Sequence, residues 1–464
     1  MLTGAAWPLP KWLLLCLLLR LPAVGFADGF DYPDQQFQYV EPAWHAATGQ
    51  ALHHTWELRA GLRGQVYPWL LANVFQGLRA VGCDEPLATM RAVRFVHAVF
   101  SLLPMALFWL VVVRWRPIAA PRPSLLLFAL SGLMVAGVQP SGPGFAALLA
   151  LSAALALPGP RWWPAFGGLC LGLAFCARFQ DALFGPGFLA ALLWQRRYAA
   201  AGWFALGCVP GICLQGFADL AVRGEFLGTP WHYAQANLAA GAAAQWRTQP
   251  FWFYLLAGVV PVLALVPPFL RVGWSRLRAG AAVLPGALVG AAVHLGVHSF
   301  IARKALRFEH GAFMMLLAVI AVGLPAASGR LARWHAGVLG TVHLGLWLAA
   351  SFWFGNAGAV RTALWLRAQP DFDGRVLVVG GDASALGGFF YSRPAADCVT
   401  GCAAEAAAMT LLAAGPATPP FVVAVREQLP EDLARTAGLT LAAAFQGQWD
   451  LREGERRFVY RVRR

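Results

Sequence analysis

Charged residues, and acidic ones above all, are scarce in this chain of 464 residues. Asp and Glu together number 22, and all charged residues make up 12% of the chain, whereas a soluble globular domain carries roughly 25%. This scarcity argues against a soluble globular protein. Hydrophobic residues account for 59% of the chain instead, which predicts an integral membrane protein.

Two kinds of binding motif are missing as well. The segment GGDASALGG lacks the spacing of a nucleotide loop, and the eight cysteines show no metal-ligand spacing with histidine. We therefore expect neither a cofactor nor a metal. Cys398 and Cys402 could pair in an oxidising compartment, although a regular helix would hold residues at this spacing badly for a disulfide.

Apolar runs long enough to cross a bilayer recur along most of the chain. They predict an all-α polytopic membrane protein with about eleven transmembrane helices, followed by a small C-terminal α/β domain outside the membrane. The predicted spans are residues 12–27, 92–113, 123–138, 144–158, 162–177, 181–195, 199–220, 250–270, 279–297, 311–328 and 336–356.

The basic residues give these spans a direction. If the gaps are assigned alternately, starting with Lys11 inside, the arginines gather in the inside gaps and the outside gap 139–143 has no Lys or Arg. This predicts a bacterial inner-membrane protein with a cytoplasmic N-terminus and a periplasmic C-terminus. Because the arginines are spread over separate loops, the net charge of +14 is weak evidence for nucleic acid, and we expect none.

The first apolar segment resembles a signal peptide, with Lys11 ahead of the run and small residues at its end. We interpret it as a retained helix. Arg20 lies within it, and a buried charge is costly in lipid. We therefore expect Arg20 to extend to the membrane interface or to pair with an acidic residue of the bundle.

The sequence predicts two domains, a transmembrane domain over residues 1–360 and an external α/β domain over 361–464. Within the first domain, residues 28–91 form a large outside loop, and residues 298–310 a short, densely charged one. In the second domain, hydrophobic periodicity predicts a helix over 429–438 and strands over 374–381, 421–428, 439–449 and 455–464.

The loop over 28–91 concentrates acidic residues in a chain that has few. Asp28, Asp31, Asp34 and Glu41 fall within a short stretch after the first apolar segment. Carboxylates beside a bilayer are costly unless they face water or a bound partner. The stretch is therefore a candidate active site, with a solvated acidic loop as the alternative.

This loop reads DYPDQQFQYVEPAWHAATGQALHHTWELRAGLRGQVYP over residues 31–68. It resembles glycosyltransferase family 22, the dolichyl-phosphate-mannose-dependent mannosyltransferases of N-glycan and glycosylphosphatidylinositol assembly. The matching positions are, in order, Tyr32-Pro33-Asp34-Gln35, Phe37-Gln38, Glu41-Pro42, Thr55-Trp56-Glu57, Leu62-Arg63-Gly64 and Tyr67-Pro68.

Further segments match the family in the same order, and the resemblance covers residues 28–325. They are ARFQDAL at 177–183, Asp219 with GEFLGTPWHYAQAN at 224–237, PFWFYLLAGVVP at 250–261 and ARKALRFEH at 302–310. The chain departs from the family at Tyr32 and Arg303, where the family has His, and at Gln35 and Ala305, where it has Glu.

The resemblance implies a GT-C-type bundle that moves mannose, with inversion, from a polyprenyl-phosphate donor to a glycan or glycolipid acceptor at the bilayer. A carboxylate can deprotonate the acceptor hydroxyl, and Asp34 is the candidate base. The alternative is that Asp34 only caps the following helix. Candidate substrate-binding residues are Gln38, Glu41, Trp56, Glu57, Arg63, Arg178 and Asn237.

Arg303, Lys304 and Arg307 are the candidate ligands of the donor phosphate. The alternative, positive charge that merely flanks a span, is weakened because this gap is predicted to lie outside. A lipid-linked donor would also explain the missing nucleotide motif. No metal is required if these cations balance the phosphate.

Three other functions remain open. A transporter or flippase of lipid-linked sugars would show internal repeats and charges near the span centres. A GT-C enzyme could use a different polyprenyl-phosphate sugar, such as arabinose or glucose. The chain could also be a structural membrane subunit with a periplasmic domain. Labelled polyprenyl-phosphate-mannose would discriminate best among these.

Overall fold

The computed structural model of the chain divides into two compact units. It describes residues 6–50, 52, 55–239, 248–352, 355–380, 386, 388–392, 398–399, 419–425, 427–446 and 456–462. The bundle unit comprises Met1–Gly25, Gly61–Tyr67 and Arg94–Phe352; the sheet unit comprises Phe26–Ala60, Pro68–Val93 and Trp353–Arg464. The sequence predicted a division at residue 360, and the structure adds that most of the first outside loop groups with the C-terminal part.

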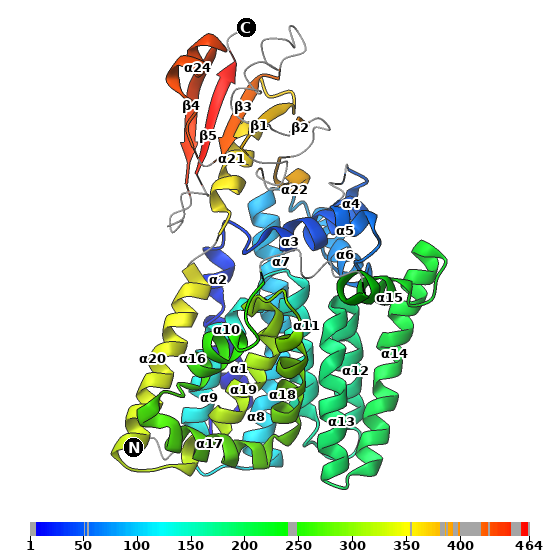
Figure 1. Cartoon of the computed structure of the whole chain (residues 1–464), viewed down its shortest axis with the longest axis vertical. Coiled ribbons are helices and arrows are strands. Elements are labelled where there is room, and N and C mark those ends of the chain that lie inside the picture. The colour runs from blue at the N-terminus through cyan, green and yellow to red at the C-terminus, as the bar shows by residue number, and fades with distance from the viewer. Residues whose placement is uncertain are drawn as a thin grey trace. The chain divides into compact units, whose positions relative to one another are not determined.

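The bundle unit is helical throughout its described residues (Figure 1). Labels with η mark short 3₁₀ and π turns. The elements are α1 (Leu9–Leu18), α2 (Leu21–Gly25), the second part of α7 (Pro86–Phe100), α8 (Leu102–Trp109), η2 (Leu110–Trp115), α9 (Pro121–Ala129), α10 (Gly132–Ala136), α11 (Gly142–Ala156), α12 (Trp163–Ala177), η3 (Phe179–Leu183), α13 (Phe184–Trp194), α14 (Tyr198–Arg223), α15 (Gly228–Ala234), η4 (Gln235–Ala239), η6 (Leu255–Val259), α16 (Val260–Leu263), η7 (Pro267–Phe269), α17 (Leu270–Val283), α18 (Pro285–Phe300), η8 (Leu306–Glu309), α19 (His310–Val322), η9 (Leu324–Ala326) and α20 (Arg330–Phe352).

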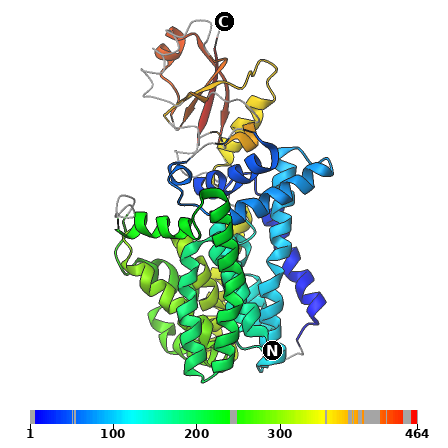
Figure 2. The same ribbon diagram turned by 90° about the vertical axis from the view of Figure 1, so that its right-hand side faces the viewer.

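Two helices form the centre of the bundle unit. Helices α11 and α19 are buried along almost their whole length and contact each other, as expected for helices that are apolar on every side. Helix α12 packs between α11 and α14, and Figure 2 shows these helices, cyan-green to green, running along a common direction. At Gly172 and Gly211 the backbones of α12 and α14 meet so closely that a Cβ on Gly211 would lie 2.2 Å from the Gly172 carbonyl carbon.

The predicted number of eleven spans is not confirmed. Among the described residues, three helices are long and apolar enough to cross a membrane: Pro86–Trp115, Tyr198–Arg223 and Arg330–Arg367. A fourth span is possible if the bent pair Leu255–Leu263 and Pro267–Val283, which meet at 51°, counts as one. Shorter apolar helices cover Gly142–Ala156 and Trp163–Ala177.

Prolines and helix caps divide several of the predicted spans. The run 123–138 becomes α9 and α10, because the Ser131 hydroxyl accepts a hydrogen bond from the Leu133 N–H and starts a new helix there. In the run 250–270, Pro261 has no N–H to donate to the preceding turn. That turn widens into the π turn η6, and the helix ends at Ala264 in the left-handed conformation.

Arg20 divides the first segment and has neither of the two predicted environments. Helix α1 ends at Leu18 and α2 begins at Leu21. The Arg20 side chain is fully buried, and its guanidinium donates hydrogen bonds to the Ser101 hydroxyl at 2.5 Å and to the Cys16 carbonyl at 2.6 Å. The arginine is thus solvated by neutral oxygens of the bundle unit, which offset part of its desolvation cost.

The sheet unit joins short helices of the first outside loop to a five-stranded sheet. Its helical elements are α3 (Pro33–Gln35), η1 (Gln36–Val40), α4 (Glu41–Thr48), α5 (Trp56–Arg59), most of α6 (Val66–Ala80), the first part of α7, α21 (Ala357–Arg367), α22 (Gly388–Ser392) and α24 (Glu431–Thr436). Its strands are β1 (Val376–Val379), β2 (Cys398–Val399), β3 (Phe421–Val425), β4 (Leu439–Phe445) and β5 (Arg457–Val462).

The sheet has the strand order β2-β1-β3-β5-β4. Strand β1 is parallel to β2 and β3, with Val376 opposite Phe421, and β5 is antiparallel to β3 and β4. Both faces of β1 are buried: Leu377 and Val379 pack in one apolar cluster and Val376 and Val378 in another. A strand covered on both faces is apolar at every position, which is why the run over 374–381 has no polar alternation.

Within the described residues the predicted strands β1, β3, β4 and β5 and the predicted helix α24 are confirmed. The predicted strand positions 381, 426, 447–449, 455 and 463–464 lie outside the described residues. The sequence analysis did not anticipate β2, whose two residues are too few for a periodic pattern. The suggested Cys398–Cys402 pair lies partly outside the described residues, because Cys402 is not among them.

Candidate active site

Three arginines gather around one aromatic ring in the bundle unit. Arg178 follows the last residue of α12, and Arg303 and Arg307 lie in the segment between α18 and α19. Their guanidinium carbons lie 5.4, 5.8 and 5.3 Å from the centre of the Phe308 ring. A ring face stabilises such cations, so Phe308 holds together charges that would otherwise repel one another. We refer to these residues as the arginine cluster.

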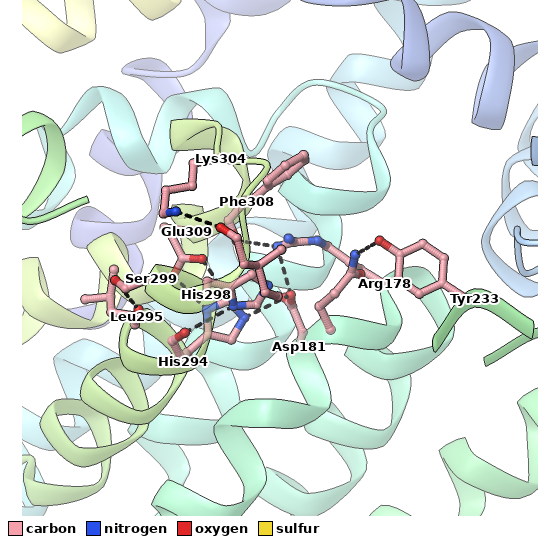
Figure 3. Close-up of polar contacts among 12 residues, drawn as sticks. Arg178, Asp181, Tyr233, His294, Leu295, His298, Ser299, Lys304, Phe308 and Glu309 are labelled. Carbon is pink, nitrogen blue, oxygen red and sulfur yellow. Dashed lines mark hydrogen bonds and ion pairs between the residues drawn. The ribbon is translucent and has the colours of Figure 1, made fainter. Parts of the chain in front are cut away.

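Arg178 is the most firmly held member of the arginine cluster. It is buried, with 7% of its surface exposed, and its Nη1 donates to Asp181 Oδ1 at 3.0 Å and to the Phe308 carbonyl at 2.5 Å (Figure 3). Asp181 lies three residues later, in the 3₁₀ turn η3. This buried pair fixes the guanidinium in one orientation, and an arginine so placed can meet a planar anion with two N–H groups.

Lys304 was predicted to bind phosphate and lies between the other two cations of the loop. Its ammonium is buried and donates to the carbonyls of Gln249 at 2.9 Å and Ile301 at 2.7 Å. Burial lowers the pKa of Lys304. Because the Gln249 N–H donates to the Ala302 carbonyl at 3.1 Å, the ammonium strengthens a pairing of two segments. Phosphate binding by Lys304 stays a prediction.

Arg63 and Asn237 both contact Tyr233 in the bundle unit, Arg63 at the ring and Asn237 at the backbone carbonyl. The Arg63 guanidinium carbon lies 5.7 Å from the centre of the Tyr233 ring, and Asn237 Nδ2 donates to the Tyr233 carbonyl at 3.0 Å. The Gln180 side chain donates to the Tyr233 hydroxyl. The predicted residues Arg63 and Asn237 thus share a network with Gln180, which lies two residues after the predicted Arg178 along the chain.

Two histidines and a glutamate beside this network were not anticipated. His294 and His298 lie one turn apart on α18, and Glu309 ends η8. Glu309 Oε2 lies 2.7 Å from His294 Nδ1, and Oε1 lies 3.3 Å from His298 Nδ1. The i, i+4 spacing of HLGVH was a signal for this pair, but it could not reveal a glutamate on another element as the third member.

In the sheet unit, Asp34 lies at the start of the helical segment formed by α3, η1 and α4. Pro33 occupies the first helical position, Tyr32 is the N-cap, and Asp34 falls in the first turn with its side chain half-buried. The alternative role of Asp34 as a helix cap is therefore not what the structure shows. Its position suits a carboxylate, because the N-terminal end of a helix stabilises negative charge.

Two residues near Asp34 in the sequence, Gln35 and Asp28, form hydrogen bonds or ion pairs with other residues. Gln35, which replaces the glutamate of the family, is buried and accepts a hydrogen bond from the Asp31 N–H at 3.0 Å. Asp28 pairs with Arg91 at 3.3 Å and with Arg361 at 3.6 Å. The acidic stretch is therefore not a uniformly solvated loop.

The predicted substrate ligands Gln38, Glu41 and Glu57 are buried, and each forms a hydrogen bond within the sheet unit. Gln38 Nε2 donates to Glu57 Oε2, which joins η1 to α5. Glu41 Oε1 accepts hydrogen bonds from Gln36 Nε2 at 3.0 Å and from the Phe390 N–H at 2.9 Å. Glu41 thereby joins the first loop to α22 within the sheet unit.

Trp56 differs from these residues because 41% of its surface is exposed. It begins α5 directly after Thr55, whose side chain accepts a hydrogen bond from the Leu58 N–H and caps the helix. An exposed indole beside buried polar residues can stack on a sugar face, and it can equally lie at a membrane interface. Its substrate contact stays a prediction.

The chain resembles known mannosyltransferases in sequence. The profile of the Alg9-like mannosyltransferase family matches residues 11–359. The chain is 23% identical over 287 residues to mannosyltransferase APTG1 of Arabidopsis thaliana, which covers 56% of this chain and 49% of that protein. It is 25% identical over 385 residues to GPI mannosyltransferase 3 of Trypanosoma brucei brucei, which covers 70% and 66%. The matches thus span between half and two thirds of these relatives.

The fold is similar to that of a solved membrane protein. The crystal structure of ArnT from Cupriavidus metallidurans bound to undecaprenyl phosphate matches with a TM-score of 0.64 over 97% of both chains, at 14% identity. The apo state of the same protein matches with a TM-score of 0.59 at 13% identity. The predicted helical GT-C-type membrane fold is confirmed by this likeness, and so is the predicted resemblance to the family.

Proposed function

Because this chain belongs to the Alg9-like mannosyltransferase family, we propose that it is a glycosyltransferase of the membrane. It moves a sugar, mannose in our proposal, from a polyprenyl-phosphate donor to a glycan or lipid-linked acceptor, with inversion at the anomeric carbon. One relative supports the acceptor class, since GPI mannosyltransferase 3 is named for a glycolipid. One structural neighbour supports the donor class, since ArnT was solved with undecaprenyl phosphate.

The observation that carries this proposal is the arginine cluster. Three guanidinium groups within 5.8 Å of one ring centre make a strongly cationic spot in the bundle unit, whose central helices α11 and α19 are apolar. Guanidinium groups bind phosphate oxygens through paired N–H groups. We assign to Arg303 and Arg307 the donor phosphate, and to Arg178, held by Asp181, the orientation of that phosphate.

The reaction needs a base as well as an anion site. In our proposal Asp34 takes the proton of the acceptor hydroxyl, and the hydroxyl oxygen forms a bond to the anomeric carbon of the donor. The bond from that carbon to the phosphate oxygen breaks, and its electron pair stays on the phosphate. The arginine cluster stabilises the charge that develops there, which is the kind of electrostatic stabilisation that enzymes use most.

The network around Tyr233 is the candidate for binding the sugar or the acceptor. Arg63 lies over the Tyr233 ring, and Asn237 bonds to the Tyr233 carbonyl one helical turn away; an arginine beside an aromatic ring suits a sugar with one apolar face and several hydroxyls. Lys304 supports the loop that carries Arg303 and Arg307. No metal or cofactor takes part in this transfer as proposed.

We propose the bacterial inner membrane as the location, with the N-terminus in the cytoplasm and the C-terminus in the periplasm. The arginine distribution over the inside gaps supports this orientation. A reporter fused after Arg464 should be active only outside the cytoplasm, and a reporter at Arg197 only inside. The reverse result at either position would contradict the orientation.

The transfer is tested with the purified chain in detergent and polyprenyl-phosphate-[14C]mannose, offered with membrane lipid extracts as acceptors. We expect labelled product that depends on the protein and that falls at low donor concentration in Arg307→Gln. Arg278→Gln is the matched control, because Arg278 is an exposed arginine of α17 outside the arginine cluster. If label is transferred from a polyprenyl-phosphate-arabinose or -glucose donor and not from the mannose donor, the sugar assigned in the proposal is wrong. If the protein moves the donor from one leaflet of a vesicle to the other without transferring its sugar, the chain is a flippase and not a transferase.

A further inference from the structure

His294, His298 and Glu309 form a buried cluster that the transfer reaction does not use. The two histidines point from one face of α18, because residues four apart share a helix face. Their rings stack with centroids 4.3 Å apart, and Phe184 stacks on His294 at 4.1 Å. One nitrogen of each imidazole and one oxygen of Glu309 lie within 4.8 Å of one another. Figure 3 shows the three side chains converging beside Asp181.

The polar atoms of this cluster are incompletely satisfied. Glu309 and His294 have no exposed surface, and Asp181 has 1%. Within the described part of the chain, Glu309 Oε1, His294 Nε2 and Asp181 Oδ2 have no hydrogen-bond partner. A buried polar atom without a partner is costly, typically ~1–3 kcal/mol, and several in one place indicate a missing ligand. That ligand has to be small, because the atoms lie so close together.

The charges indicate that the ligand is a cation. Glu309 and Asp181 bring two negative charges, and Arg178, which pairs with Asp181, brings one positive charge. Among the described residues, the ion-pair partners of Glu309 are His294 and His298 and include no Lys or Arg. With neutral histidines this buried carboxylate has no cationic partner, which is strongly unfavourable. A cation bound beside Glu309 removes this imbalance.

We propose that His294, His298 and Glu309 bind a divalent transition-metal ion, with Zn²⁺ as the reference ion. Two imidazoles and one carboxylate are a ligand set of zinc sites that keep one position open, and imidazole nitrogen favours Zn²⁺ over Mg²⁺ or Ca²⁺. Asp181 lies 3.8 Å from His294 Nε2, on the side of the ring away from Glu309. It is therefore placed as the carboxylate that orients a metal-bound histidine from behind.

The metal ties α18 to the turn η8 that precedes α19. Glu309 follows Phe308 directly, and the Phe308 carbonyl accepts the hydrogen bond of Arg178. Fixing Glu309 therefore fixes the ring and the carbonyl around which the arginine cluster is built. The role is structural, and the site stands whether or not the chain transfers mannose.

The competing explanation is a proton. A protonated His294 would lie between Glu309 at 2.7 Å and Asp181 at 3.8 Å and would balance the charge without a metal. It would leave Glu309 Oε1 without a hydrogen-bond partner, whereas a metal can use both oxygens of Glu309. The two explanations differ in metal content and in the response to a chelator.

The test begins with the unmodified chain, purified in detergent through a tag without histidine. The protein is incubated with Zn²⁺, passed over a desalting column and analysed by elemental mass spectrometry. We expect about one Zn²⁺ per chain, and after treatment with a chelator we expect no Zn²⁺ and a melting temperature lower by several degrees. Co²⁺ in its place should give the visible absorption bands of a four- or five-coordinate site. No retained metal, or a melting temperature that chelation leaves unchanged, overturns the proposal.

Two variants locate the ion. His298→Asn and Glu309→Gln should each lower the retained Zn²⁺ to a small fraction of that of the unmodified chain. His343→Asn is the matched control, because His343 is another fully buried histidine, bound to the Ser131 hydroxyl at 3.0 Å and the Val262 carbonyl at 3.0 Å. It should retain the metal. Equal retention in all three variants overturns the site; if the variants do not fold, the measurement on the unmodified chain decides.

Discussion

The arginine cluster of the bundle unit and the acidic stretch of the sheet unit were both predicted as functional, and they are built differently. The three arginines come from separate segments and meet at one ring. The acids of the stretch lie close in sequence, yet their surroundings differ: Asp28 pairs with two arginines, Glu41 is buried and bonds to Gln36 and Phe390, and Asp34 is half-buried at a helix start. Nearness in sequence thus did not make these acids equivalent.

Burial and hydrogen bonding rank the candidate catalytic and phosphate-binding residues. A buried carboxylate that already accepts two hydrogen bonds within its own unit contributes to stability, and replacing it leaves its donors unsatisfied. A half-buried carboxylate at a helix start, like Asp34, remains the better candidate for chemistry. Burial ranks two cations of the loop in the same way, because Arg307 is only partly buried, whereas Lys304 is buried and its ammonium donates to two backbone carbonyls.

The largest effect is expected at Asp34. Asp34→Asn keeps the size of the side chain and removes the basic carboxylate, so turnover with the polyprenyl-phosphate donor should fall by roughly 100-fold or more while the membrane level of the protein is kept. Asp31→Asn, three residues earlier and exposed, is the control and should fall far less. Near-normal turnover in Asp34→Asn, with loss in Glu57→Gln, would show that the base had been misassigned.

A smaller effect is expected in the arginine cluster. Arg307→Gln removes a charged donor to the phosphate, a loss of about 1.5–3 kcal/mol, which should raise the KM for the donor by roughly 10- to 100-fold. The thermal midpoint should change little, because Arg307 is only partly buried. An unchanged KM for the donor would show that Arg307 does not bind the donor phosphate and only flanks a span.

In contrast to Arg307, substitution of Lys304 should affect stability more than the KM for the donor. Lys304→Met keeps the length of the side chain but leaves the Gln249 and Ile301 carbonyls without their donor, so unfolding should become easier by about 1–3 kcal/mol. The donor KM of the remaining folded enzyme should rise less than in Arg307→Gln. If the KM rises as much and the thermal midpoint stays, Lys304 binds the phosphate as the sequence predicted.

The smallest effect on transfer is expected at Glu41. Glu41→Gln weakens the hydrogen bonds to Gln36 and Phe390 and should destabilise the sheet unit by about 1–2 kcal/mol, measured as faster limited proteolysis near α22. The turnover of the folded enzyme should stay within a few-fold. Glu427→Gln, an exposed acid of the same unit, is the control. A large loss of turnover with unchanged proteolysis would instead support the predicted role of Glu41 in substrate binding.

The sequence by itself determined much of this protein. Its composition identified a membrane protein, the motifs from Asp34 to Arg307 identified the family, and alternation and apolar runs located β1, β3, β4, β5 and α24. These features are local, because a run, a period or a motif is contained in one stretch of chain. The number of spans was not determined in this way, since caps and prolines divide apolar runs without changing their hydropathy.

Only the tertiary structure decided which side chains meet. Glu309 joins His294 and His298, Phe308 gathers Arg178 with Arg303 and Arg307, and Glu41 bonds to Phe390 across 349 residues of chain. Such contacts depend on how helices pack and on which polar atom finds a partner after burial. Helix packing and the pairing of buried polar atoms cannot be predicted from the spacing of residues along the chain, because the partners lie on different elements.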